Sequence, residues 1–127
     1  MNKLEAKFTT KFEKWWKQTK VLGAYEIKVV RGVSMPFSVV PDHQLNALRA
    51  AQKGFIYKIP DDSMGQKPCD CLAVGNNGYL VVHWIKRGNK QFYIFPINVW
   101  DDIINNSNRK SLTEQMARDH GIICELI

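Results

Sequence analysis

The chain has 127 residues, which is enough for one hydrophobic core and therefore for one domain. Hydrophobic residues make up 45% of the sequence, which speaks against disorder, and 18 Lys and Arg outnumber 12 Asp and Glu, which favours a polyanionic partner. No apolar run is long enough to cross a bilayer and the N-terminus lacks an apolar signal segment, so we expect a cytoplasmic protein with no membrane partner.

The N-terminal segment predicts an amphipathic helix over residues 2–19. Its large apolar residues recur at helical spacing and form one broad stripe: Leu4, Phe8, Phe12, Trp15 and Trp16. Four lysines step along another face: Lys3, Lys7, Lys11 and Lys14. Such a ridge is solvated surface when taken alone, but beside a nucleic-acid cleft it would contact backbone phosphates. Glu13 lies between stripe and ridge, where it either reaches toward a cleft or pairs with a lysine.

The segment from Gly23 to about Arg31 predicts a strand with an unusual placement of charge. Because successive side chains of a strand alternate between its faces, Glu26 and Lys28 share one face while the apolar side chains around them share the other. In a core, both charges would need partners to offset their desolvation. In a cleft, the pair could hold a divalent cation and a water molecule for phosphodiester hydrolysis.

The rest of the chain predicts an alternation of helices and strands. Residues 32–40 read as an irregular loop, and Pro41-Asp42 opens a second helix that stops at Gly54. Strands, helices and turn signals follow: a strand at 55–59, a strand at 68–74, a hairpin turn at 75–78, strands at 79–85 and 91–95, a helix at 96–105, a capping box at 111–114 that starts a helix to 119, and a strand at 122–127. This order predicts an α/β fold: a mixed central sheet flanked by helices.

Two polar residues outside the charged strand are candidates for the same site. Gln44 lies in the first turn of the second helix, where it either caps the helix or holds a water or phosphate. Asp70 lies near the start of the strand predicted at 68–74 and is either a turn aspartate or a second metal ligand beside Glu26. The backbone carbonyl of Ile27 would complete a set of hard oxygen ligands. His83, in an apolar strand, is expected to be a core histidine.

These segments resemble the PD-(D/E)xK nuclease superfamily, and within it the Holliday-junction resolvases of bacteria, archaea and phages. The motifs that carry the resemblance are Glu26-Ile27-Lys28, the loop 34–38, His43-Gln44, and the Lys-Pro-x-Asp segment at 67–70. The resemblance implies a restriction-endonuclease-like fold and a metal-dependent deoxyribonuclease that uses Mg²⁺ or Mn²⁺, acts on branched DNA and works as a homodimer. It implies a cytoplasmic protein of phage or prophage origin.

The resemblance also assigns roles to residues. Metal would be held by Asp70, Glu26, the carbonyl of Ile27 and Glu13, and catalysis would use Glu26, Lys28, Asp70 and Gln44. DNA contacts would come from basic residues: Lys7, Lys11, Lys14, Arg31, Lys58 and Lys67. For each of these taken alone, simple surface exposure is the competing interpretation.

One departure from the family pattern leaves the function open. In most members the metal-binding aspartate precedes Glu-x-Lys, whereas here no aspartate lies between the first helix and Glu26, and Asp70 follows it. The first hypothesis is therefore a nuclease with a rearranged site. The second is a catalytically inactive nucleic-acid-binding protein that retains the nuclease fold. A third is a protein-interaction module whose charge is incidental.

Overall fold

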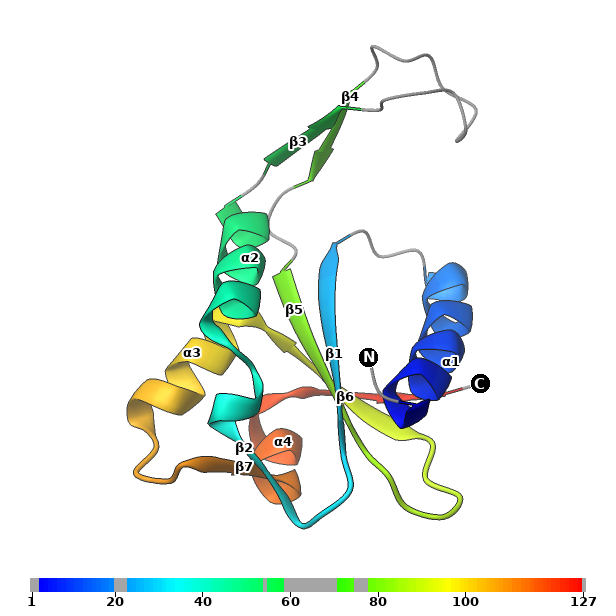
Figure 1. The fold of residues 1–127 in the computed structure, drawn as a ribbon, viewed down its shortest axis with the longest axis vertical. Coiled ribbons are helices and arrows are strands. Elements are labelled where there is room, and N and C mark those ends of the chain that lie inside the picture. The colour runs from blue at the N-terminus through cyan, green and yellow to red at the C-terminus, as the bar shows by residue number, and fades with distance from the viewer. Residues whose placement is uncertain (1–2, 20–22, 54, 59–70, 75–77, 127) are drawn as a thin grey trace.

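The computed structural model describes residues 3–19, 23–53, 55–58, 71–74 and 78–126. They form one small α/β domain with a mixed central sheet flanked by helices (Figure 1). The elements follow the predicted order with two short strands and a 3-10 turn added: α1 (Lys3–Thr19), β1 (Ala24–Val30), β2 (Ser34–Pro36), η1 (Phe37–Val39), α2 (Asp42–Lys53), β3 (Phe55–Lys58), β4 (Cys71–Val74), β5 (Gly78–Trp84), β6 (Gln91–Pro96), α3 (Ile97–Asn106), β7 (Ser111–Thr113), α4 (Glu114–His120) and β8 (Ile122–Glu125).

The central sheet has the strand order β1-β5-β6-β8. β1 runs parallel to β5, while β6 is antiparallel to both β5 and β8. β5 is an almost unbroken apolar run because it lies inside the sheet and is covered on both faces: Leu80, Val81 and Val82 are fully buried. The predictions of a mixed sheet and of a strand near the C-terminus are confirmed.

Helices cover both faces of this sheet (Figure 1). On one face, Phe8 and Phe12 of α1 pack against Val81 and Phe92, as the predicted apolar stripe requires. On the other face, α2, α3 and α4 contribute a larger cluster that includes Leu45, Leu48, Trp100, Ile103 and Ala117. β1 therefore lies between two helical layers, and the direction of each side chain on it decides which layer it meets.

His83 is a core histidine, as the apolar strand around it predicted. Its side chain is buried and stacks on Phe8 with ring centroids 4.5 Å apart. Nδ1 lies 2.8 Å from the carbonyl oxygen of Gln91. Burial lowers the pKa of the His83 imidazole despite this hydrogen bond. The ring is therefore neutral near pH 7, and Nδ1–H donates to the carbonyl.

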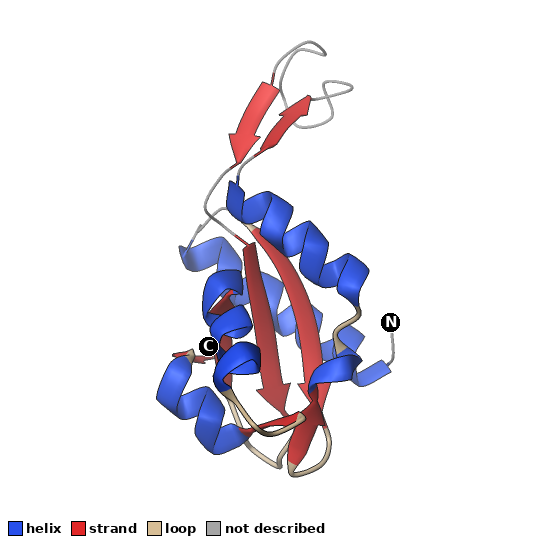
Figure 2. Ribbon diagram, turned by 90° about the vertical axis from the view of Figure 1, so that its left-hand side faces the viewer, coloured by secondary structure: helices blue, strands red, loops and turns tan. Residues whose placement is uncertain are grey.

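The predicted hairpin between residues 68–74 and 79–85 is wrong. β4 pairs antiparallel with β3, whereas β5 pairs with β1 and β6. The β3–β4 hairpin projects from the body of the domain (Figure 2). The Gly-Asn-Asn-Gly motif favours a turn but does not determine which strands pair. The partners of β5 are set by longer-range contacts, because β5 buries both of its faces only when it lies between β1 and β6.

Two further predictions are corrected. Residues 34–36, expected as loop, form β2, which pairs antiparallel with β7. The expected capping box at 111–114 is not the start of α4, because Thr113 is the N-cap and its Oγ1 accepts from the Met116 backbone N–H at 3.2 Å. Ser111 instead belongs to β7, which is anchored by the buried Leu112.

Glu114, the fourth residue of the expected capping box, is the centre of a polar cluster. Its carboxylate accepts hydrogen bonds from Lys86 Nζ and from the Tyr93 hydroxyl, the latter at 2.9 Å, and Arg118 lies 3.6 Å away. Burial by itself would raise the pKa of the Glu114 carboxyl. The hydrogen bonds and the positive charges of Lys86 and Arg118 outweigh burial, so the pKa of this carboxyl is lowered from its usual value of 4.5.

Glu114→Gln is expected to lower the free energy of unfolding by about 1–2 kcal/mol at neutral pH, because charge-assisted hydrogen bonds are lost. Since the folded-state pKa is depressed, this stabilisation is present above pH 4.5 and is lost as the pH falls through the folded-state value. Urea unfolding of both proteins at several pH values measures the difference. A difference that stays constant between neutral and strongly acidic pH would contradict the assignment.

Candidate active site

Glu26 and Lys28 share one face of β1, as the alternation predicted. Their neighbours Ala24 and Val30 on the same face pack into the cluster that α2, α3 and α4 cover. Lys28 Nζ lies 3.6 Å from Glu26 Oε1, and the two side chains are 13% and 27% exposed. The pair is thus partly buried at the edge of the sheet, on the side where α2 packs against β1 and β5.

The backbone between the two charged residues turns its carbonyl away from the sheet. The carbonyl oxygen of Val30 accepts from the Ile85 N–H at 2.8 Å, so Val30 directs its backbone groups toward β5. In an extended strand these directions alternate along the chain, and Ile27, three residues earlier, therefore directs its carbonyl away from β5. In the part of the chain that the structure describes, β5 is the strand paired with β1, so this carbonyl faces an open edge.

Gln44 has a side-chain amide oxygen that lacks a hydrogen-bond partner in the described structure. It lies in the first turn of α2, and its backbone N–H donates to the Pro41 carbonyl at 3.0 Å. Its side-chain Oε1 is buried and has no hydrogen-bond partner among the described residues. A buried amide oxygen without a partner is costly, and such an atom points to a binding or catalytic role or to a bound water.

Glu13 is not brought to this pair. It is exposed on α1 and lines a pocket with Trp16, Tyr25 and Ile27, on the sheet face opposite Glu26 and Lys28. Burial, followed by the nearby Tyr79, raises the pKa of Tyr25 to about 12, so its phenol is neutral and offers no base. This pocket therefore contains one carboxylate and no second acid–base partner among its lining residues.

The second predicted carboxylate, Asp70, and the predicted DNA contact Lys67 lie outside the described residues. Lys58 is the last residue of β3 and pairs with Cys71, the residue after Asp70. Within the described ranges no three side chains of His, Cys, Asp or Glu gather closely enough to hold a metal ion. The participation of Asp70 stays a prediction.

Three of the predicted DNA-contacting residues do converge. Lys7, Lys11 and Arg31 line two adjoining hollows where α1 passes the ends of β1 and β5, whereas Lys14 is exposed one turn further along α1. Sequence reasoning missed Lys86 and Lys90 of the β5–β6 turn, and it left Lys3 out of the predicted contacts. No local signal in the sequence places Lys86 near Arg31, because these residues become neighbours only when β1 and β5 pair in parallel.

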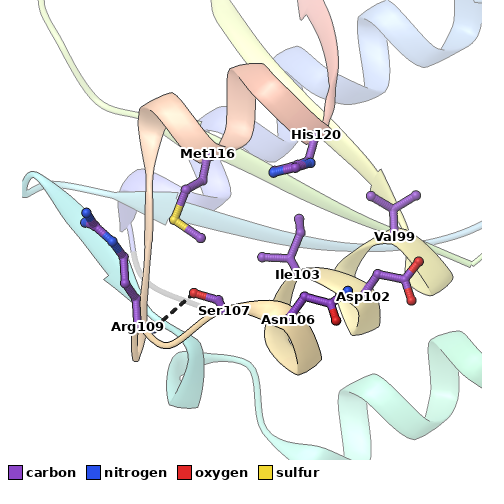
Figure 3. A pocket seen from close by; sticks show the side chains of 8 residues that line it. All are labelled: Val99, Asp102, Ile103, Asn106, Ser107, Arg109, Met116 and His120. Atoms are coloured by element: carbon purple, nitrogen blue, oxygen red, sulfur yellow. Dashed lines mark hydrogen bonds between the residues drawn. The ribbon is translucent and has the colours of Figure 1, made fainter.

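A separate pocket of about 410 Å³ lies between α3 and α4 (Figure 3). Met116 and His120 of α4 face Ile103 of α3 across it, and the Arg109 backbone N–H donates to Ser107 Oγ at 3.0 Å. Asp102 also lines the pocket, but in the described structure no ion pair joins it to Arg109 or His120. The pocket contains none of the predicted site residues and no acid–base pair.

Comparisons with models of protein families, with curated proteins and with solved structures found no match for this chain. No helix in the described part of the chain is both long and apolar enough to cross a membrane. The functional argument therefore rests on the residues and their geometry.

Proposed function

We propose that this protein is a metal-dependent endonuclease that hydrolyses DNA phosphodiester bonds with Glu26 and Lys28 at its centre. The observation that carries the proposal is the ion pair of these residues at 3.6 Å on an edge strand whose other positions pack into apolar cores. Taking two charges out of water costs free energy that well-packed apolar residues would avoid. A partly buried ion pair on an edge strand is therefore better explained by chemistry than by stability.

The oxygen atoms at this edge fit a hard divalent cation. Mg²⁺ prefers carboxylate and carbonyl oxygens and retains several waters, and the Glu26 carboxylate and the outward carbonyl of Ile27 come from adjacent residues. Asp70 would complete the set. When bound, Mg²⁺ or Mn²⁺ supplies Lewis acidity and lowers the pKa of a bound water.

The chain's own residues have distinct tasks in this hydrolysis. Water oxygen bonds to phosphorus and gives up one proton to solvent, while the bond from phosphorus to one sugar oxygen breaks and that oxygen takes up a proton from solvent and leaves as a hydroxyl. The Lys28 ammonium orients the attacking water and balances the negative charge that develops on the phosphoryl oxygens. Gln44 Oε1, an acceptor without a described partner, accepts a hydrogen bond from that water.

The preferred substrate in this proposal is branched DNA, cut by a homodimer with a restriction-endonuclease-like fold in each subunit. Two-fold symmetry in the protein would match two symmetric strands in a four-way junction. The fold alone does not select among nucleases, so the choice of substrate rests on the resemblance of the Glu-x-Lys, His-Gln and Lys-Pro-x-Asp segments.

The test is cleavage of labelled four-way-junction, flap and linear duplex DNA in Mg²⁺, in Mn²⁺ and in EDTA, with the wild type beside Asp70→Ala. We expect metal-dependent cutting that Asp70→Ala abolishes while binding survives. Cutting that is unaffected by Asp70→Ala would remove this residue from the site. Salt-sensitive binding without cutting of any substrate would favour a catalytically inactive nucleic-acid-binding protein, which the basic hollows beside α1 also suit.

Gln44→Met separates a catalytic from a structural role for the buried amide. Since Gln44 Oε1 lacks a described partner, replacing the amide by an apolar side chain of similar volume is expected to raise the free energy of unfolding by about 1 kcal/mol. Cleavage is expected to fall about tenfold or more, because the water loses its acceptor. Urea unfolding and single-turnover cleavage measure the two effects. A loss of stability together with unchanged cleavage would show that the amide is structural.

A further inference from the structure

A continuous basic groove runs along the N-terminal half of α1. Two adjoining hollows of about 280 Å³ and 670 Å³ share Leu4, Lys7 and Ile85 in their walls, so they form one depression. Its cationic side chains come from three separate parts of the chain: Lys3, Lys7 and Lys11 of α1, Arg31 after β1, and Lys86 and Lys90 of the β5–β6 turn. None of the described residues that line it is acidic.

Most of this positive charge is not neutralised within the fold. Lys86 is bound to Glu114, but in the described part of the chain no ion pair involves Lys3, Lys7, Lys11, Arg31 or Lys90. Like charges gathered at one place repel each other and cost stability. A groove that nevertheless collects them is suited to an anionic ligand.

The side of the groove opposite α1 is held in a fixed shape. In the β5–β6 turn, Gly88 has a φ of +74°, a backbone conformation that residues other than glycine rarely adopt. Asn89 ties the turn to the strands on both sides, because its Nδ2 donates to the Trp84 carbonyl at 2.8 Å and its Oδ1 accepts from the Gln91 N–H at 3.1 Å. Lys86 and Lys90 therefore extend from a constrained turn.

We propose that this groove binds the phosphates of a nucleic-acid backbone, at a site distinct from the Glu26–Lys28 pair. Lysines four residues apart on a helix are spaced by about 6 Å along its axis, so α1 presents a row of charges rather than a single anion pocket. A row matches a polymer that carries regularly spaced phosphates. The lysines of α1 project from the helix that covers one face of the sheet, while Glu26 and Lys28 point to the other face.

The inference deepens the proposed function by naming a substrate-holding surface, but its test does not depend on cleavage. Lys7→Gln with Lys11→Gln removes two charges from the groove. Lys17→Gln with Lys110→Gln removes the same number of charges from exposed positions that do not line the groove, and it is the matched control. Binding of labelled duplex and four-way-junction DNA is measured by fluorescence anisotropy in EDTA over a range of salt concentrations.

We expect the groove variant to bind more weakly and to lower the slope of log K against log salt by about two, because about 0.9 counterion is released per neutralised phosphate. The control is expected to stay near the wild-type slope. Equal losses in both variants would mean that net charge alone is responsible, and no loss in the groove variant would mean that DNA lies elsewhere. Either result overturns the proposed site.

A second readout reports the place of binding. His83 lines the groove, whereas His120 lies at the end of α4 in the pocket beside α3. Added duplex DNA is expected to shift the ring resonances of His83 and to leave those of His120 unchanged. Unshifted His83 resonances at saturating DNA would contradict the proposal. If the groove assignments hold and no substrate is cut, the nuclease proposal fails while this inference stands.

Discussion

Lys28→Ala is expected to lower the single-turnover rate of DNA cleavage by about 10²–10³-fold, while DNA binding in EDTA stays close to that of the wild type. The ammonium lies 3.6 Å from the Glu26 carboxylate and the Lys28 side chain is 13% exposed, so its electrostatic interactions are screened less than those of a surface lysine. In the proposed mechanism, its loss removes the cation that would orient the water and stabilise the developing phosphoryl charge. Quenched-flow or manual sampling of a labelled substrate at saturating protein measures the rate.

Lys110→Ala is the matched control for this substitution. Lys110 is exposed just before β7 and belongs to neither the charged strand nor the basic groove. Its rate is expected to equal that of the wild type. A variant lacking Lys28 that cleaves as fast as the control would show that the ion pair is structural. Circular dichroism on both variants confirms that they are folded at the assay temperature.

Gly78→Ala is expected to lower the free energy of unfolding by about 3 kcal/mol. A Cβ atom at Gly78, the first residue of β5, would lie 2.1 Å from the backbone oxygen of Leu48 and 2.9 Å from its carbonyl carbon. Backbone atoms in the middle of a helix cannot move aside singly, so α2 as a whole would have to shift away from the sheet. The Gly78 N–H, 3.5 Å from Gln52 Oε1, would lose that contact.

Gly32→Ala is the control, because a Cβ atom there would have no heavy atom within 4 Å. Its free energy of unfolding is expected to change by about 0.5 kcal/mol or less. Urea unfolding followed by tryptophan fluorescence measures both variants. If the two glycine variants are equally stable, the backbone of α2 at Leu48 does not pack on the start of β5 as closely as the structure shows.

Local patterns account for most of the fold. The stripe of α1, the alternation along β1 and the apolar run of β5 each depend on nearby residues, and each is confirmed by the burial of Phe8, the shared face of Glu26 and Lys28, and the central place of β5. These patterns are reliable because a strand or helix with a buried face must repeat its apolar residues at its own period.

Features that depend on distant partners could not be predicted. β2 and β7 have three residues each and gain their stability only by pairing with one another across most of the chain. The Gly and Asn residues at 75–78 predict a hairpin that joins the strands on either side of them. In the structure β4 instead pairs with β3, the strand that precedes it in the chain. Glu114 was assigned to a helix cap because of its spacing, but tertiary contacts with Lys86 and Tyr93 fix it instead.

The candidate site was predictable only in part for the same reason. Glu26 and Lys28 are two residues apart, so their common face follows from strand geometry alone. The basic groove is different, because Arg31 and Lys86 become neighbours only when β1 and β5 pair in parallel with Val30 opposite Trp84. The spacing of the lysines along α1 groups Lys14 with Lys7 and Lys11. The structure shows that only Lys7 and Lys11 line a hollow with the β5–β6 turn, and this depends on how that turn folds.

The most direct test of the proposed catalytic centre is the Mg²⁺ dependence of four-way-junction cleavage by the wild type and by Glu26→Gln, with DNA binding in EDTA as the reference. We predict that the wild type cleaves only with metal, that Glu26→Gln is slower by about 10²-fold or more and needs more Mg²⁺, and that both bind DNA equally well. Cleavage by Glu26→Gln at the wild-type rate and metal dependence, or a wild type that binds the junction but does not cut it, would contradict the assignment of Glu26 and Lys28 as a hydrolytic site.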